Sequence, residues 1–236
     1  MNGLEITPQS IFVFQIQVKE VGVLVTDCPC LAADMEKIWE VYWALGGATS
    51  LPSSWPAELA TSYNADTPLT LPSLPEVFLS SSPAPFCPSG REVDITAIIK
   101  AIDSAEKFVE IAVMDYIPAT LYTHPMQFWP DIDDALRRAA INRGVRVRLL
   151  TSHWAHTRPA IARFLRSLAD LSGSSPKVDI EVEKSDSKLA LILPSEQVKV
   201  FTVPSFTPAQ EKIPFARVNH NKYMVTDKQV EQMSRT

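Results

Sequence analysis

The sequence has few or none of the features that identify membrane-spanning proteins, proteins with a signal peptide, and proteins that bind polyanions through overall charge. Only 7 glycines stand against 19 prolines, which indicates long irregular connections. No stretch approaches the roughly 20 apolar residues that cross a bilayer, and the N-terminal region lacks the basic and unbroken apolar parts of a signal peptide. The net charge of -5 and the pI of 5.4 exclude a protein that holds polyanions by overall charge. A phosphate substrate would therefore need a local basic site.

Cysteine is also scarce, with Cys28, Cys30 and Cys87 as the only three. Their number is odd, and the Cys-Pro-Cys spacing is too tight for a four-ligand zinc site. We expect one disulfide between Cys87 and one of the other two. The redox compartment stays open.

What is present is ordinary globular composition, with 46% hydrophobic residues in 236, enough to bury a sizeable core. The valine-rich run 18–27 predicts a strand, and residues 31–45 predict a helix that stops at Gly46 and packs Met35, Ile38, Trp39 and Tyr42 into a core. A connection rich in Ser and Pro follows over 49–88.

Beyond residue 90 the pattern becomes regular. Asp94 caps a predicted helix, and Gly144 ends another. Strands are expected over 108–115, 145–151 and 178–182, with helices over 95–107, 131–143 and 158–171. This alternation predicts the α/β class, with a mixed, mostly parallel sheet flanked by helices. Ligands then bind where the strands end, after Met114, after Leu150 and near Val200.

One short segment carries the strongest chemical signal. His220 and Lys222 lie two residues apart, so both project from one face of an extended segment. The imidazole can attack phosphorus or protonate a leaving oxygen, and the ammonium can neutralise phosphate oxygens. Asp227 follows five residues later and would accept a hydrogen bond or orient the site. A solvated surface strand is the alternative interpretation.

The segment HNKYMVTD resembles the His-x-Lys-x4-Asp signature of the phospholipase D superfamily. The segments LPSSWPAELATSYNADTP, CPSGR, FWPDIDDALRRAAINRGVRVRLLTSHW and IPFARVNHNKYMVTD are similar to the C-terminal half of animal phospholipase-D-like lysosomal exonucleases. The similarity runs from about Gln17 to Asp227, with one internal interruption. It implies a domain organisation in which 1–48 is a remnant of an N-terminal half, 49–90 a connection, and 91–236 a one-motif C-terminal domain with an atypical end.

The resemblance implies one half of a phospholipase D fold and a phosphodiesterase that acts through phosphohistidine, with no metal and no cofactor. In that family two motifs meet across a pseudo-dyad. Relatives are membrane glycoproteins of the endolysosomal system or endoplasmic reticulum, described as 5′-to-3′ exonucleases on single-stranded nucleic acid and linked to phospholipid synthesis. The implied catalytic residues are His220, Lys222 and Asp227, and the implied substrate is a phosphodiester in nucleic acid or phospholipid.

Three departures qualify that expectation. No other histidine has a lysine two places on, so a second motif would come from a homodimer or another half-site subunit. Residues 183–198 are an insertion relative to the family. The apolar strand expected after Asp227 is replaced by KQVEQMSRT. We therefore expect an incomplete form of the enzyme, and the alternative is an inactive fragment that acts as a binding partner.

Other candidate groups are weaker. His153 and His156 could bind a metal, but no carboxylate or cysteine is near, so a loop role is favoured over substrate contact. Asp133 and Asp134 suit the positive end of a helix. Trp129 and Trp154 could stack bases, although packing is the preferred interpretation. Eight arginines could track a phosphate backbone, but their spacing favours a solvated face: Arg137, Arg138, Arg143, Arg146, Arg148, Arg158, Arg163 and Arg166.

Overall fold

The computed structural model describes residues 4–5, 18–71, 76–174, 178–182, 200–205 and 207–232. The chain divides into two units. The first unit comprises Met1–Thr7, Val23–Ile98 and Ser234–Thr236, and the second comprises Pro8–Gly22 and Ile99–Met233. The domain boundaries at residues 48 and 90 remain predictions from the sequence.

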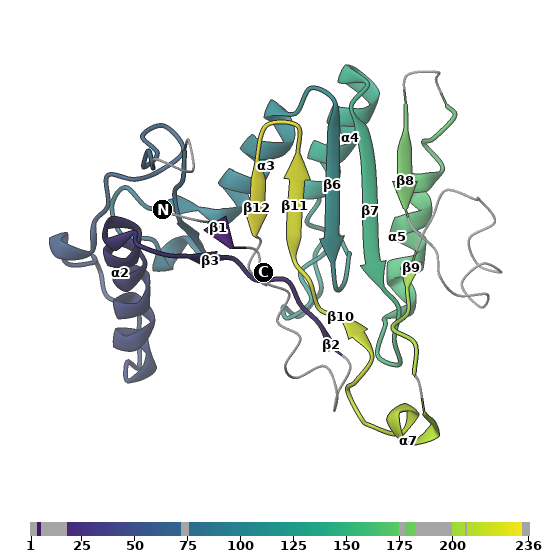
Figure 1. The fold of residues 1–236 in the computed structure, drawn as a ribbon, viewed down its shortest axis with the longest axis horizontal. Helices are drawn as coiled ribbons and strands as arrows, with labels where there is room; N and C mark the ends of the chain where they lie inside the picture. The colour runs from purple at the N-terminus through teal and green to yellow at the C-terminus, as the bar shows by residue number, and fades with distance from the viewer. Residues whose placement is uncertain are drawn as a thin grey trace. The chain divides into compact units, whose positions relative to one another are not determined.

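The second unit contains a six-stranded sheet, in the order β12, β11, β6, β7, β8, with β9 also paired to β7 (Figure 1). Strands β6 to β9 are parallel, whereas β11 is antiparallel to both β6 and β12. This mixed, mostly parallel sheet confirms the predicted fold class. The strands are β6 (Phe108–Val113), β7 (Arg146–Ser152), β8 (Ile180–Val182), β9 (Val200–Phe201), β11 (Tyr223–Thr226) and β12 (Val230–Gln232).

Helices α4 (Asp131–Arg143) and α5 (Pro159–Ala169) pack behind the sheet in Figure 1, against β7 and β8 respectively. Gly144 ends α4 in the left-handed conformation, with φ 67°, and its N–H donates to Ala140 O at 3.1 Å. Helix α3 (Asp94–Ser104) precedes β6. The predicted helices and strands of this region are thus confirmed. Large side chains that are almost fully buried form the core: Ile102, Val109, Leu136, Leu149, Leu165, Leu168, Ile180 and Met224.

The valine-rich run 18–27 does not form the single strand expected. It divides into β2 (Val18–Lys19) and β3 (Leu24–Val25). Strand β2 pairs in parallel with β10 (Val218–Asn219), whereas β3 pairs antiparallel with β1 (Leu4–Glu5). Because the two halves of the run find partners in different units, tertiary context overrides the local β propensity.

The first unit is built around helix α2 (Pro29–Gly46), which begins with a proline at its first position and ends at the predicted glycine. The remaining elements are short, which agrees with the irregular connection predicted over 49–88. They are η1 (Ala57–Leu59), β4 (Ser80–Ser81), η2 (Ala84–Phe86) and β5 (Glu92–Val93), and β4 pairs in parallel with β5. The second unit also has the short helix α7 (Pro208–Glu211).

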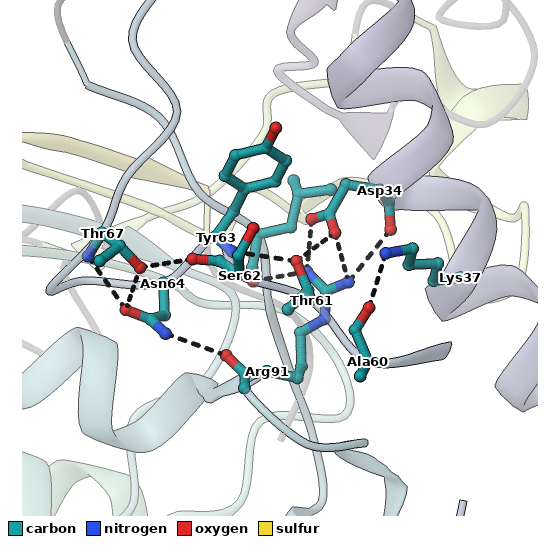
Figure 2. A network of polar contacts seen from close by, with 11 residues as sticks. Asp34, Lys37, Ala60, Thr61, Ser62, Tyr63, Asn64, Thr67 and Arg91 are labelled. Carbon is teal, nitrogen blue, oxygen red and sulfur yellow. Dashed lines mark hydrogen bonds and ion pairs between the residues drawn. The ribbon is translucent and has the colours of Figure 1, made fainter. Parts of the chain in front are cut away.

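A buried polar network ties α2 to the connection that follows it (Figure 2). Arg91 binds the Asp34 carboxylate with both terminal nitrogens, at 2.6 and 2.9 Å, and Thr61 Oγ1 donates to the same carboxylate at 2.6 Å. Both charged side chains are almost wholly buried, at 0% and 2% exposure. Neighbouring Gly90 has φ +81°, and a Cβ there would lie 1.9 Å from Thr61 O. The backbone thus permits only glycine at this close approach.

The aromatic residues of α2 are not core residues, contrary to the expectation. Met35 is 54% exposed, Trp39 53% and Tyr42 47%. Trp39 instead stacks on the more exposed Trp43, with ring centroids 4.9 Å apart. Helical spacing identifies one face of a helix but does not show what covers that face.

The disulfide expected at Cys87 does not form, and all three cysteines are free. The thiol of Cys87 donates to Ser81 O at 3.3 Å, and Cys28 Sγ lies 3.7 Å from Cys30 Sγ. Partial burial raises the pKa of the Cys87 thiol, with a further contribution from the negative charge of Asp94. Cys87 is therefore an inert, protonated thiol near neutral pH.

Part of the segment KQVEQMSRT, which replaces the apolar strand expected after Asp227, forms a short strand. Strand β12 pairs with β11 in the register Val225 with Val230. The insertion over 183–198 lies outside the described residues. No helix in the described ranges is long and apolar enough to cross a membrane.

Candidate functional site

The candidate site begins at the pairing of β2 with β10, near the carboxyl end of β7. The Asn219 N–H donates to Ser152 Oγ at 3.1 Å, and Ser152 is the last residue of β7. In parallel sheets this is the edge at which ligands bind. The sequence analysis expected a ligand after Leu150 on the same grounds, and the structure brings His220 to this edge.

The strand register places a carboxylate beside His220. Val218 pairs with Val18 and Asn219 with Lys19, and the His220 N–H continues the ladder by donating to Lys19 O at 2.9 Å. The next pair across the ladder is therefore Glu20 and His220. The Glu20 carboxylate contacts His220 Nδ1. Because an ionised carboxylate only accepts, Nδ1 carries the hydrogen, and in the neutral form of the ring Nε2 presents its lone pair.

Lys222 lies next to the same backbone. Its ammonium donates to the His220 carbonyl oxygen, so the cation is folded back towards the imidazole-bearing residue. His220 is about one-third exposed, at 34%, and Lys222 is half-buried. The positive charge and an accessible imidazole are thus held on one short segment between β10 and β11.

Two amide side chains flank His220, the buried Asn219 and the half-buried Asn221. Asn221 Nδ2 donates to Asn219 Oδ1 at 2.5 Å, which aligns the two side chains. Asn219 Nδ2 and Asn221 Oδ1 are buried and have no hydrogen-bond partner among the described residues. Buried polar atoms of native proteins are usually paired, so unpaired ones at a site indicate contact with a ligand or with water.

Asp227 does not lie beside His220, so its predicted role as the residue that orients the site is corrected. Strand β11 runs antiparallel to β6 and pairs Tyr223 with Ala112 at one end and Thr226 with Val109 at the other. About 13 Å of strand therefore separates the two residues. Asp227 Oδ1 accepts N–H groups of Glu106, Lys107 and Phe108 at 3.0, 2.9 and 3.3 Å.

These backbone hydrogen bonds, the one from Lys107 first, lower the pKa of Asp227. The carboxylate anchors the turn between α3 and β6 in its charged form. Its role in the structure is to fix the far end of β11, and with it the register that carries His220.

Five of the eight arginines considered for phosphate binding are engaged in ion pairs within the second unit. Arg137 pairs with Asp133, Arg138 and Arg143 with Asp103, and Arg146 and Arg148 with Glu110. Their charges are therefore largely neutralised, as a solvated structural face requires.

Asp133 also has a structural role, in agreement with its position in the first turn of α4. It accepts hydrogen bonds from the Tyr116 hydroxyl and from Arg137 Nε. Burial and the charge of Asp133 raise the pKa of Tyr116 well above its ordinary value. Tyr116 is therefore a neutral hydrogen-bond donor that holds the segment after β6 to α4.

A family model described as PLD3/4, PLD-like domain matches residues 6–188. This is well over half of the chain. The chain belongs to the PLD3/4 family of phospholipase-D-like domains. The matched range ends before His220.

Relatives extend the similarity across most of the chain. The 5′-3′ exonucleases PLD3 of Rattus norvegicus and Homo sapiens are each 47% identical to it over 218 residues, which is 90% of this chain and 41% of each relative. The probable phospholipase D F09G2.8 of Caenorhabditis elegans is 47% identical over 216 residues. The chain therefore spans less than half the length of these PLD3/4-family relatives.

Two solved structures show limited overlap with the chain. A phospholipase D family member, Nuc from Salmonella typhimurium, is 18% identical, with a TM-score of 0.30, and covers 58% of this chain and 60% of its own. NucT from Helicobacter pylori is 13% identical, with a TM-score of 0.33, over 58% and 61% of the two chains.

Glu20 is the residue of the candidate site that could not be predicted from the sequence. It lies in the run 18–27, where it reads as a charged position on a strand, and it is separated from His220 by 200 positions. Parallel pairing over that distance leaves no local signal. A covariation of residues 20 and 220 among relatives would be the signal to seek.

Proposed function

We propose that the chain is a phosphodiesterase in which His220 acts at phosphorus, Lys222 holds phosphate oxygens and Glu20 orients the imidazole. The contact between Glu20 and His220 Nδ1 is the observation that carries the proposal, because it leaves Nε2 as a nucleophile or proton carrier. Lys222 and the paired amides of Asn219 and Asn221 support it by supplying a cation and polar groups on the same segment.

In the nucleophilic role, Nε2 of His220 attacks phosphorus, and a P–N bond forms as the P–O bond to the leaving group breaks. The leaving oxygen takes a proton from a second imidazole. Water then attacks the phosphohistidine and gives its proton to that second imidazole, and the P–N bond breaks. In the other role, His220 is the proton donor and the second imidazole the nucleophile.

A second imidazole is needed because one ring cannot be the nucleophile and the proton donor in the same step. His124, His153 and His156 have no lysine two places on. We therefore propose that a second copy of the chain supplies the other half of the site. The substrate would be a phosphodiester of single-stranded nucleic acid or of phospholipid, and the names of two relatives, a 5′-3′ exonuclease and a probable phospholipase D, support a substrate of one of these two classes. The location proposed by resemblance is the endolysosomal lumen or the endoplasmic reticulum.

The test is the hydrolysis of a chromogenic phosphodiester by the full chain and by three variants. His220→Ala and Lys222→Ala are each expected to lower the rate by at least about a thousandfold, because each removes a group that acts in the transition state. Lys228→Ala is the matched control, since Lys228 lies beyond β11 and pairs with Glu106 at 3.1 Å. Turnover that survives His220→Ala would exclude the assigned site.

A further inference from the structure

Three aromatic rings stack beside the segment that leads to His220. The His156 ring lies parallel to that of Phe215, with centroids 4.6 Å apart and an interplanar angle of 11°. Trp154 meets His156 edge-on at 4.7 Å. Phe215 is 68% exposed and His156 is exposed, whereas Trp154 is half-buried and closes the stack from one side. We call these three residues the aromatic platform.

The platform is attached to the candidate site at both of its ends. Trp154 and His156 follow Ser152, which accepts the Asn219 N–H at 3.1 Å. The turn they occupy is closed by the bond from Trp154 N–H to Thr157 Oγ1, at 3.0 Å. Phe215 lies five residues before His220. The rings are therefore presented by the two segments whose contact positions the imidazole.

The backbone before His220 adopts an uncommon conformation that presents the Phe215 ring. Phe215 has φ 57° and Arg217 has φ 58°, both in the left-handed region that non-glycine residues avoid. Such conformations persist where the surrounding structure imposes them, and they are frequent at ligand sites. In this segment the apolar ring of Phe215 is left 68% exposed.

Three cationic residues lie close in sequence to the residues of the platform. Within the described residues no ion pair involves Arg158, Lys212 or Arg217, whereas the arginines of α4 and β7 are paired with acidic residues. Arg158 follows the turn of His156, and the other two flank Phe215 in the chain. A flat apolar surface with available positive charge fits the bases and phosphates of a single nucleic-acid strand.

We propose that the exposed face of the aromatic platform stacks the nucleobase adjacent to the phosphodiester held at His220. This inference rests on the proposed phosphodiesterase function and identifies residues of this chain that would contact an unpaired base of a nucleic-acid substrate. An acyl chain has no planar face to match the parallel rings. A base paired in a duplex already stacks on its neighbours, so only an unpaired base can occupy the platform.

The test measures the fluorescence anisotropy of a labelled single-stranded oligonucleotide bound to the full chain. Phe215→Ala is expected to weaken binding about tenfold, since base stacking on one aromatic residue is lost, and His156→Ala is expected to weaken it in the same direction. Phe215→Tyr keeps a ring of the same geometry and should restore affinity. Ile141→Ala is the control, because Ile141 is also an exposed apolar residue, at 46%, but lies near the end of α4 that leads into the start of β7, away from the carboxyl ends of the strands.

An abasic oligonucleotide of the same length separates stacking from charge. The wild-type chain and Phe215→Ala should bind it with equal affinity, because it keeps the phosphates and lacks the bases. The proposal is overturned if Phe215→Ala weakens binding of both oligonucleotides equally or has no effect on binding. It is also overturned if the wild-type chain binds neither oligonucleotide. A loss of binding to anionic phospholipid vesicles in Phe215→Ala, with oligonucleotide binding intact, would overturn it as well.

The binding measurement involves no turnover, so the two proposals can fail separately. If the chain binds the oligonucleotide as expected but hydrolyses no phosphodiester, the proposed platform stands and the proposed enzymatic function is rejected. If hydrolysis depends on His220 but the affinity for the oligonucleotide is unchanged by Phe215→Ala, the proposed enzymatic function stands and the proposed platform is rejected.

Discussion

The carboxylate of Asp227 acts on the architecture of the site from a distance. It accepts three consecutive backbone N–H groups at the start of β6, while His220 lies beyond the opposite end of β11. The chemical identity of a motif residue therefore does not fix its role. An acceptor-only side chain is equally suited to holding a turn and to orienting a catalytic group.

Asp227→Asn should lower stability at neutral pH and do so less at acidic pH. Because the folded-state pKa is below the ordinary value of 3.8, the charged form adds stability that is full above 3.8 and is lost as the pH falls through the folded-state pKa. Urea denaturation of both proteins at about pH 7 and about pH 2.5 measures this difference. A gap that stays constant across that range would contradict the assignment.

Glu20 shows the limit of prediction at the scale of single residues. The proximity of His220 and Lys222 could be predicted because their spacing of two is a local property of the chain. The contact that fixes the tautomer depends on a parallel ladder between residues 18–19 and 218–219. Nothing in either short segment specifies the other, since parallel pairing across a long connection is set by the tertiary structure.

At the scale of elements, prediction succeeded for helices and strands whose hydrophobic residues recur regularly over a long segment and are buried on one face. Strands β6 and β7 and helices α4 and α5 were all predicted from the sequence close to their observed bounds. The aromatic face of α2 was not, because amphipathic spacing in a helix is equally compatible with an exposed stripe. The prediction of a single strand over the valine-rich run 18–27 was wrong because the two halves of the run pair with different strands.

The buried ion pair of Arg91 and Asp34 holds α2 against the irregular segment that follows it in the chain. Arg91→Met is expected to destabilise the protein by about 3–5 kcal/mol, because it leaves a buried carboxylate without its partner. Arg138→Met makes the same change in a pair that is 46% and 39% exposed and should cost about 1 kcal/mol or less. Urea denaturation followed by tryptophan fluorescence measures both.

Adding Asp34→Leu to Arg91→Met removes the stranded charge and should recover part of the lost stability. If Arg91→Met and Arg138→Met cost the same, the burial of the Arg91 pair does not carry the stability assigned to it.

At the scale of the whole molecule, the single His-x-Lys motif makes assembly the decisive question. If two copies complete one site, a pair that carries one His220→Ala subunit is inactive. Co-refolding equal amounts of wild-type and His220→Ala chains should then leave about a quarter of the wild-type activity, whereas independent subunits would leave about half. Activity measured across a series of mixing ratios distinguishes the quadratic from the linear dependence.

The ladder between β2 and β10 also has a consequence for synthesis. Glu20 is translated 200 positions before its imidazole partner. A nascent chain thus carries no assembled histidine–carboxylate pair before residue 220 has been made. Closure of so long a loop is intrinsically slow, so we expect this pair to be among the later contacts to form during folding.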